Sequence, residues 1–283
     1  YHATFEEYFD AKAALFGRVL GDDGVAVINI DDPRGPDMAA IAQKREIEVI
    51  SVGRMEGADI QLTAQRFHGM GQEVFFKHNS RGYRADLKLM GGFQAENVLL
   101  AAVLVIAAGE DPQAVFETLD HMETVRGRMQ LAATRDNGAT VFVDYSHTPD
   151  AIATALQAMR PHIPGRIIAI IGAGGDRDTS KRPLMGAAAA EHADIVIVTD
   201  DNPRHEDAAQ IRQAILAQCP MAQDIADRGQ AIDAALAQAQ ADDMVLVAGK
   251  GHETGQIIGD TILPFNDVTY IAQALGQSEV RHG

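Results

Sequence analysis

The second half of the chain alternates short apolar runs with amphipathic stretches. Four runs rich in β-branched residues predict buried parallel strands: Thr140–Asp144, Arg166–Ile171, Asp194–Thr199 and Met244–Ala248. Helices are predicted at about Pro149–Arg160, Arg182–Glu191, Ala208–Ala217 and Gln230–Ala239. β-Rich residues around Gly259–Leu263 and a last helix, Val268–Leu275, follow. The β-α-β series predicts an α/β fold with a Rossmann-like, doubly wound sheet.

The first half has a different pattern. An amphipathic helix is predicted from Phe5 to about Leu20, with Thr4 and Glu7 as a capping box. A small β-α-β unit follows, with its strands at Gly24–Asp31 and Glu46–Val52 and a helix around Met38–Lys44. Alternating segments between Ala58 and Leu89 predict antiparallel strands. Two helices follow, at about Gln94–Ala108 and from Asp111-Pro112. We place a boundary near Val125–Arg128, which predicts domains 1–125 and 126–283.

Three predicted strands of the second domain end in loops rich in glycine and charge. These loops are Gly172–Asp178, Asp200–Glu206 and Gly249–Glu253. In open α/β sheets, ligands bind at the carboxyl ends of the strands, so the loops predict a binding site. Pro203 stiffens the second loop because its φ angle is fixed. A simpler interpretation is a polar loop that caps the helix beginning near Asp207.

The glycine spacing excludes two common nucleotide motifs. Counted from Gly172, the dinucleotide fingerprint G-x-G-x-x-G requires glycine where Arg177 stands. A P-loop fails as well, because Gly249-Lys250 is followed by Gly251 rather than by serine or threonine.

Composition narrows the class of protein. The chain has 283 residues, 46% of them hydrophobic and 23% charged, which is ordinary globular material. Its net charge of −16 argues against a nucleic-acid partner. No apolar run approaches the roughly 20 residues of a membrane span, and the lone Cys219 cannot form an internal disulfide. These features predict a cytoplasmic protein with no membrane partner, and we expect a monomer.

Six motifs together resemble the Mur ligases, the ATP-dependent enzymes that add amino acids to the peptidoglycan precursor. They are Tyr1-His2-x-Thr4 with Tyr8, Lys12 and Phe16; Gly127-Arg128-Met129; Asp144 to Asp150; Gly174 to Asp178 with Lys181 to Gly186; Thr199 to Arg204; and Gly249 to Glu253. The similarity covers essentially the whole chain and is greatest to the members that add meso-2,6-diaminopimelate. Gln94, Gln130 and His205 depart from the usual residues of the family.

The resemblance implies that the chain is a fragment. Members of the family carry an N-terminal domain for the UDP end of the substrate and a central ATPase domain that opens with a P-loop. This chain begins inside the central domain and continues through the C-terminal, amino-acid-binding domain. We therefore expect the isolated chain to be inactive as a ligase.

The resemblance also implies the chemistry. ATP phosphorylates the terminal carboxylate of UDP-N-acetylmuramoyl-L-alanyl-D-glutamate (the UDP-MurNAc-dipeptide), and the amine of meso-diaminopimelate attacks the acyl phosphate. The matching positions for diaminopimelate are Arg177, Asp201, Asn202, Pro203, Arg204, Gly249 and Glu253. Arg204 would bind the distal carboxylate, while Asp201 and Glu253 would face the distal ammonium or order the loop. For Arg177, an ion pair with Asp176 or Asp178 is the alternative.

The implied nucleotide and metal residues are fewer. Lys12 resembles a lysine that is carbamylated and then binds Mg²⁺, although by itself it reads as a lysine whose stem covers apolar surface. Asn97 and Arg128 resemble residues that contact adenine and an ATP phosphate, and Asp144 resembles one near the ribose. Ordinary packing on a helix surface or in a loop is the alternative for each.

Several other functions stay open. Within the family, the chain could come from a lysine-adding member or another Mur ligase; Arg204 discriminates, because lysine has no distal carboxylate. The isolated chain could also be a binding module that catalyses nothing. A Rossmann oxidoreductase is held back by the failed glycine spacing.

Overall fold

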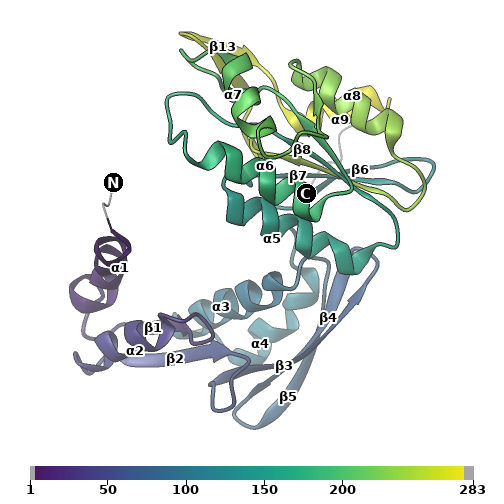
Figure 1. Ribbon diagram of the computed structural model, residues 1–283. Helices are drawn as coiled ribbons and strands as arrows, with labels where there is room; N and C mark the ends of the chain where they lie inside the picture. Colours follow the sequence, from purple (N-terminus) through teal and green to yellow (C-terminus); the bar gives the residue numbers. More distant parts are fainter. Residues whose placement is uncertain (1–3, 277–283) are drawn as a thin grey trace. The chain divides into compact units, whose positions relative to one another are not determined.

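The computed structural model describes residues 4–276, and the chain divides into two compact units, Tyr1–Glu123 and Thr124–Gly283 (Figure 1). The division lies two residues before the boundary that we place after residue 125. Tyr1 and His2, which belong to the first motif, lie outside the described residues. Within residues 4–276, no helix combines the length and the apolar character needed to cross a membrane.

The first unit combines parallel and antiparallel strands in one sheet. Its elements are α1 (Phe5–Ala14), η1 (Leu15–Val19), β1 (Val25–Asn29), α2 (Gly35–Gln43), β2 (Glu48–Gly53), β3 (Ile60–His68), β4 (Gly71–His78), β5 (Arg81–Leu87), α3 (Phe93–Ala107), α4 (Pro112–Glu117) and η2 (Leu119–His121). The sheet order is β1-β2-β3-β4-β5, parallel from β1 to β3 and antiparallel from β3 to β5.

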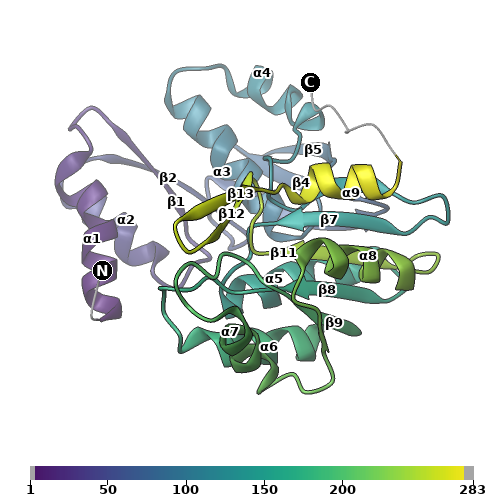
Figure 2. The ribbon, with the colours of Figure 1, turned by 90° about the horizontal axis from the view of Figure 1, so that it is seen from above.

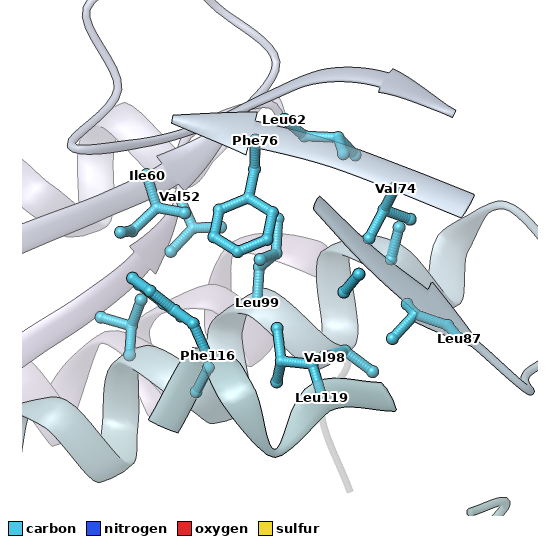
Figure 3. Close-up of a cluster of buried hydrophobic side chains, with 14 of the residues drawn as sticks. Val52, Ile60, Leu62, Val74, Phe76, Leu87, Val98, Leu99, Phe116 and Leu119 are labelled. Carbon is cyan, nitrogen blue, oxygen red and sulfur yellow. The ribbon is translucent and has the colours of Figure 1, made fainter. Parts of the chain in front are cut away.

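The core of the first unit lies between the antiparallel strands and helices α3 and α4. Figure 3 shows Phe76 of β4 directed towards Leu99 of α3 and Phe116 of α4. The rings of Phe76 and Phe116 meet edge to face, with their centroids 5.0 Å apart. The alternation that predicted these strands therefore places one face of the sheet on a helical layer.

The second unit is a six-stranded sheet with a small hairpin. Its elements are β6 (Gln130–Thr134), β7 (Thr140–Asp144), α5 (Pro149–Met159), η3 (Arg160–His162), β8 (Ile167–Ile171), α6 (Lys181–His192), β9 (Ile195–Val198), α7 (Ala208–Leu216), β10 (Gln223–Asp224), α8 (Arg228–Gln238), β11 (Met244–Ala248), β12 (Gly255–Ile258), β13 (Thr261–Pro264) and α9 (Asp267–Ala274). The order is β10-β9-β8-β11-β7-β6, and only β6 is antiparallel.

Helices cover both faces of this sheet. Helices α8 and α9 lie on one face of the sheet and α5 and α6 on the other (Figures 1 and 2). Ile168, Ile170 and Val245 form one hydrophobic cluster with residues of α8 and α9. Strands β7, β8 and β11 are buried at every position, as expected for parallel strands between two helical layers. The predicted fold class, a partial central α/β domain followed by a doubly wound Rossmann-like domain, is confirmed.

The sequence pattern missed or misplaced several elements. The N-terminal helix is α-helical only to Ala14 and continues as a short π-helix to Val19. Strands β6 and β10 were not predicted, because the first is alanine-rich and the second has two residues. The predicted capping of the first helix is partly confirmed, since Thr4 Oγ1 accepts a hydrogen bond from the Glu7 amide at 3.2 Å.

Two ion pairs, the first of them fully buried, stabilise the second unit. Arg228, at the start of α8, pairs with Asp267, at the start of α9, through bonds of 2.7 and 2.8 Å, and both side chains are fully buried. Arg228 also donates to the carbonyl of Ala248, the last residue of β11. At the amino end of the sheet, Arg166 pairs with the buried Asp243 at 2.6 Å.

Candidate amino-acid-binding site

The three loops singled out from the sequence follow neighbouring strands. β9, β8 and β11 are adjacent in the sheet, and their carboxyl ends lead into the loops at Thr199, Gly172 and Gly249. The loops also contact one another, because the Gly175 amide donates to the Asn202 carbonyl at 2.9 Å. The structure thus gathers in one place residues that are more than 70 positions apart in the chain.

Asp200 and Asp201, adjacent in sequence, have different environments. The Asp200 carboxylate pairs with Arg212 of α7, and burial raises its pKa although Arg212 acts in the opposite direction. Asp201 is 7% exposed, and its carboxylate accepts no hydrogen bond from the residues that the structure describes. The Asp201 carboxylate can therefore accept hydrogen bonds from a ligand, whereas that of Asp200 is paired with Arg212.

Asn202 is held by three partners. Its Oδ1 accepts from the Lys250 ammonium at 3.1 Å and from the Ile257 amide at 2.9 Å, and its Nδ2 donates to Glu253 Oε2 at 2.8 Å. Both partners of Oδ1 can only donate, so the orientation of the carboxamide is fixed by chemistry.

Lys250 lies beneath the site. Its side chain is fully buried, and Nζ donates to Asn202 Oδ1, Glu253 Oε2 and the Gly255 carbonyl at 3.1, 3.0 and 2.6 Å. These three acceptors use all three protons of an ammonium group. Since no donor is left for a phosphate, the geometry agrees with the exclusion of a P-loop at Gly249-Lys250.

Glu253 offers a charged acceptor at the edge of this network. Burial raises the pKa of its carboxyl, but hydrogen bonds from Asn202 and Lys250, together with the charges of Lys250 and Arg204, hold the pKa below its usual value. Oε2 receives both hydrogen bonds, whereas Oε1 receives none from the described residues. With a third of the side chain exposed, Oε1 is available to a ligand.

Arg204 is presented by a strained backbone. Its φ is 51°, in the left-handed region. Two backbone hydrogen bonds join it to the end of β12: the Arg204 amide donates to the Ile257 carbonyl, and the Gly259 amide donates to the Arg204 carbonyl. Nη1 is anchored on the Gly175 carbonyl at 2.9 Å. Nε and Nη2 have no partner among the described residues, which leaves one two-donor edge of the guanidinium for a carboxylate.

Two glycines allow the loops to approach. A Cβ on Gly249 would lie 2.5 Å from Asp201 Oδ2, and one on Gly175 would lie 1.9 Å from the carbonyl oxygen of Pro203. Pro203 itself is buried. A side chain at Gly175 would push the backbone of the second loop away, and one at Gly249 would displace the Asp201 carboxylate.

Arg177 lies at the exposed edge of the first loop. Its Nη1 donates to the Asp176 carbonyl at 3.0 Å, and no ion pair joins it to Asp176 or Asp178 among the described residues. Asp178 instead accepts from Ser180. The alternative of an ion pair for Arg177 is thus not realised.

The predicted nucleotide residues of the second unit lie at the end of β7. The exposed Arg128 places its guanidinium 4.8 Å from the centroid of the Tyr145 ring. Asp144 is buried, and its carboxylate accepts from the amides of Met129 and Ser146. Its carboxylate therefore organises the two loops around it, as the packing alternative describes.

The remaining predicted residues lie in the first unit. Lys12 is exposed on α1, with Nζ 5.5 Å from the centroid of the Tyr8 ring. Asn97 is exposed on α3 and donates to Gln94 Oε1 at 3.4 Å. Within residues 4–276, no three histidine, cysteine or carboxylate side chains are grouped to hold a metal ion.

The sequence pattern indicates β-structure around Gly259–Leu263, which the structure shows as the second strand of the hairpin, but it does not predict the contact of the hairpin with the site. It also assigns no role to Lys250 once a P-loop is excluded; the available signal was the position of this lysine between two glycines after a buried strand. Gln256 of β12 donates to the Asp201 carbonyl at 2.8 Å, so the hairpin supports the loop through side chain and backbone. The result is a free guanidinium edge on Arg204 and free oxygens on two carboxylates, those of Asp201 and Glu253, a set suited to a zwitterion that carries ammonium and carboxylate groups.

Known proteins with similar sequences agree with this architecture. The family profile "Mur ligase middle domain" matches residues 1–105, and "Mur ligase, glutamate ligase domain" matches residues 127–251. The UDP-N-acetylmuramoyl-L-alanyl-D-glutamate–2,6-diaminopimelate ligase of Zymomonas mobilis is 46% identical over 279 residues, and that of Caulobacter vibrioides is 47% identical over 275. Each alignment covers 97% of this chain, and the chain spans 57% and 56% of these two relatives.

Solved structures give the same result. A structure of a ligase with the same name has a TM-score of 0.65 and 34% identity, covering 98% of this chain and 57% of the other. The folylpolyglutamate synthase of Mycobacterium tuberculosis, solved with ADP and AMPPCP, shares the fold at 21% identity, with a TM-score of 0.70, over 88% of this chain and 58% of its own. With both profiles matched in order, the chain belongs to the Mur ligase family, and its two units correspond to sequence of the middle domain and of the glutamate ligase domain.

Proposed function

We propose that the chain is the ATP-binding and amino-acid-binding part of a ligase that joins meso-2,6-diaminopimelate to UDP-N-acetylmuramoyl-L-alanyl-D-glutamate. The names of the relatives support this assignment. The observation that carries it is the unoccupied Nε and Nη2 edge of Arg204, in the site that also holds the free oxygens of Asp201 and Glu253. Diaminopimelate has an ammonium and a carboxylate at each end, and one end matches this set.

The site would act by positioning. In the proposed reaction, ATP transfers its γ-phosphoryl group to the substrate carboxylate, and the amine of diaminopimelate then displaces phosphate to form the amide. Binding one end of the amino acid fixes the direction of its other, reacting amine. Glu253 is suited to this task because its lowered pKa keeps it anionic at neutral pH.

ATP and Mg²⁺ belong to the same proposal. Mur ligases are ATP-dependent, and Asn97, Arg128 and Asp144 are the proposed nucleotide residues. The Arg128 guanidinium is exposed and makes no ion pair with the described residues, so it can donate hydrogen bonds to a phosphate oxygen. Asp144 would contribute through the loops that its carboxylate orders.

Lys12 is the proposed contribution to the metal site. Its ammonium is exposed and makes no ion pair with the described residues, so carbon dioxide can reach it. As a carbamate it would supply oxygen, the donor that Mg²⁺ prefers. Among the described residues, no three histidine, cysteine or carboxylate side chains complete a ligand set around it.

A lysine-adding ligase is the second candidate. Lysine shares the distal ammonium that Asp201 and Glu253 would bind, but it has no partner for the free edge of Arg204. A binding module without catalysis is the third candidate for the isolated chain.

Calorimetric titration of the chain with meso-diaminopimelate and with L-lysine separates these candidates. We expect diaminopimelate to bind at least about tenfold more tightly, because one charge-assisted contact is worth roughly 1.5–3 kcal/mol. Tighter binding of lysine would overturn the assignment of the substrate. Ligation of diaminopimelate by the full-length gene product tests the reaction itself.

A further inference from the structure

We propose that Lys250 is a positioning residue: its buried ammonium fixes Asn202 and Glu253 in the arrangement that receives the amino acid. The inference rests on the proposed function, which does not by itself assign a role to this side chain. The Lys250 ammonium lies behind Asn202 and Glu253, the residues that would face the ligand, and donates a hydrogen bond to each of them.

The first argument is the geometry of the ammonium. Lys250 brings together three chain segments: the loop after β9 through Asn202, its own loop through Glu253, and the hairpin through the Gly255 carbonyl. Its side chain is completely buried, so none of its three protons reaches solvent. No neutral side chain of similar size supplies three donors from one atom.

The second argument is charge. Glu253 and Lys250 form an ion pair at 3.0 Å, in which the lysine side chain is fully buried and the glutamate side chain is 33% exposed. The charge of Arg204, in the loop opposite, also lowers the pKa of Glu253, but Arg204 donates no hydrogen bond to it among the described residues. Without Lys250, Glu253 loses one of its two hydrogen-bond donors, and Asn202 Oδ1 loses one of its two.

The third argument is the direction of the free oxygen. Because Lys250 and Asn202 both bind Oε2, the carboxylate of Glu253 is held with Oε1 outward. A carboxylate that loses one of these anchors can rotate, and its exposed oxygen then points in no fixed direction. The loss of one hydrogen bond to a charged group typically changes an equilibrium constant by about 10- to 100-fold.

The test uses Lys250→Met, which keeps the length of the side chain and removes the charge. Arg166→Met is the matched control, since Arg166 is also paired with a carboxylate, Asp243, in the same sheet but at its amino end. Calorimetry of both variants and the wild-type chain with meso-diaminopimelate should show binding weakened about 10- to 100-fold in Lys250→Met and unchanged within about twofold in Arg166→Met.

A second readout needs no ligand. The Glu253 carboxyl, followed by carbon-13 NMR, should titrate at a higher pH in Lys250→Met than in the wild type, and at an unchanged pH in Arg166→Met. If Lys250→Met does not fold, Lys250→Gln replaces it: a neutral amide has two protons for the three acceptors, so the same changes should appear at a smaller size.

The outcomes are separable. Wild-type affinity and an unshifted Glu253 titration in a folded Lys250 variant would overturn the inference. Equal losses of affinity in Lys250→Met and Arg166→Met would do so as well, because they would show a general effect on stability. Failure of the wild-type chain to bind diaminopimelate would instead overturn the proposed function, and the Glu253 titration would still decide whether Lys250 sets the charge of that carboxylate.

Discussion

The carboxamide of Asn202 donates to Glu253 Oε2 at 2.8 Å, although 51 positions separate the two residues. This bond crosses from the loop after β9 to the loop after β11, two strands that flank β8. The strand order therefore gives the two loops their common site. Both side chains also accept a hydrogen bond from Lys250 Nζ, so a movement of one loop would strain the hydrogen bonds of the other.

Arg204→Ala should reduce kcat/KM for diaminopimelate by roughly 30-fold to several thousand-fold in the full-length gene product, because removing one partner of a charge pair that the bound ligand covers costs about 2–5 kcal/mol. The loss should be much smaller with lysine as substrate. Arg204→Lys should restore only part of the activity, since an ammonium lacks the planar two-donor edge. Steady-state kinetics with both amino acids provide the measurement.

Arg160→Ala is the control for Arg204, because Arg160 pairs with Asp194 at the amino end of the sheet. It should leave the preference between the two substrates unchanged. Equal losses for diaminopimelate and lysine in Arg204→Ala would mean that Arg204 shapes the loop and does not select the ligand.

Gly249→Ala should weaken the binding of diaminopimelate to the isolated chain, and this loss of affinity should not follow from the lowered free energy of unfolding alone. Gly249 has a φ of 112°, and an added Cβ would meet Asp201 Oδ2 at 2.5 Å. Gly138→Ala is the matched control, since Gly138 has a φ of 92° and no atom within 4 Å of an added Cβ. Both variants should lose about 1–2 kcal/mol in denaturant titrations from backbone strain, but only Gly249→Ala should lose affinity. Retained affinity in Gly249→Ala would show that Asp201 does not contact the ligand.

Lys12→Ala should abolish most ligase activity of the full-length gene product, because the proposed carbamate oxygen would be missing. Short carboxylic acids added to the assay should restore part of it by supplying a similar oxygen. Lys44→Ala, at the exposed end of α2, serves as the control and should retain activity. An unimpaired Lys12→Ala enzyme would leave Lys12 as a surface residue of the helix. Carbon-13 NMR with labelled bicarbonate detects the carbamate directly.

Asp243→Asn should destabilise the chain at neutral pH and flatten its response to acid. Burial raises the pKa of Asp243, but hydrogen bonds from Arg166 and the Gln240 amide lower it below the ordinary value of 3.8. The unfolded chain thus binds the proton more tightly, so this contribution to stability is present above about pH 3.8 and is lost as the pH falls through the lower, folded-state pKa.

The expected loss for Asp243→Asn is about 1.5–3 kcal/mol, the range for hydrogen bonds to a charged group. Urea titrations between neutral pH and pH 3 provide the measurement. The exposed neighbour Asp242 is the control, and Asp242→Asn should follow the wild type. A wild-type acid response in Asp243→Asn would mean that other carboxylates govern the loss of stability.

The 283-residue chain alone should release no phosphate from ATP, even with both other substrates present. Its sequence contains no G-x-x-x-x-G-K-[S/T] loop to cradle the β- and γ-phosphates, and Lys250, its one Gly-Lys lysine, is occupied by three acceptors. Phosphate release above that of a denatured sample would contradict this expectation.

The elements best predicted from the sequence were those whose burial is continuous. Runs such as Ile167–Ile171 contain only apolar residues and are strands between two helical layers. Gln130–Thr134 was missed because its alanines carry no β-branched signal, and its strand forms by pairing with β7. Tertiary contacts decided the structure at that point, and no local pattern contains them.

The candidate site was predicted as three loops but not as a network. Sequence alone cannot show that Asp200 is paired with Arg212 while Asp201 is free, because that difference depends on where α7 lies. It also cannot show that Lys250 turns inward to Asn202, a partner 48 positions away. The parallel strand order supplies the second result, by placing the ends of β9 and β11 on either side of β8.

The fully buried pair of Arg228 and Asp267 has a consequence for how the sequence can diverge. Replacing either residue alone leaves an uncompensated charge in a dry interior, at a cost of about 3–5 kcal/mol, close to the whole margin of a small domain. Replacing both with apolar residues of similar volume can be neutral. Related sequences should therefore either retain both residues or have apolar residues at both positions. Sequences with only one of the two replaced should be rare.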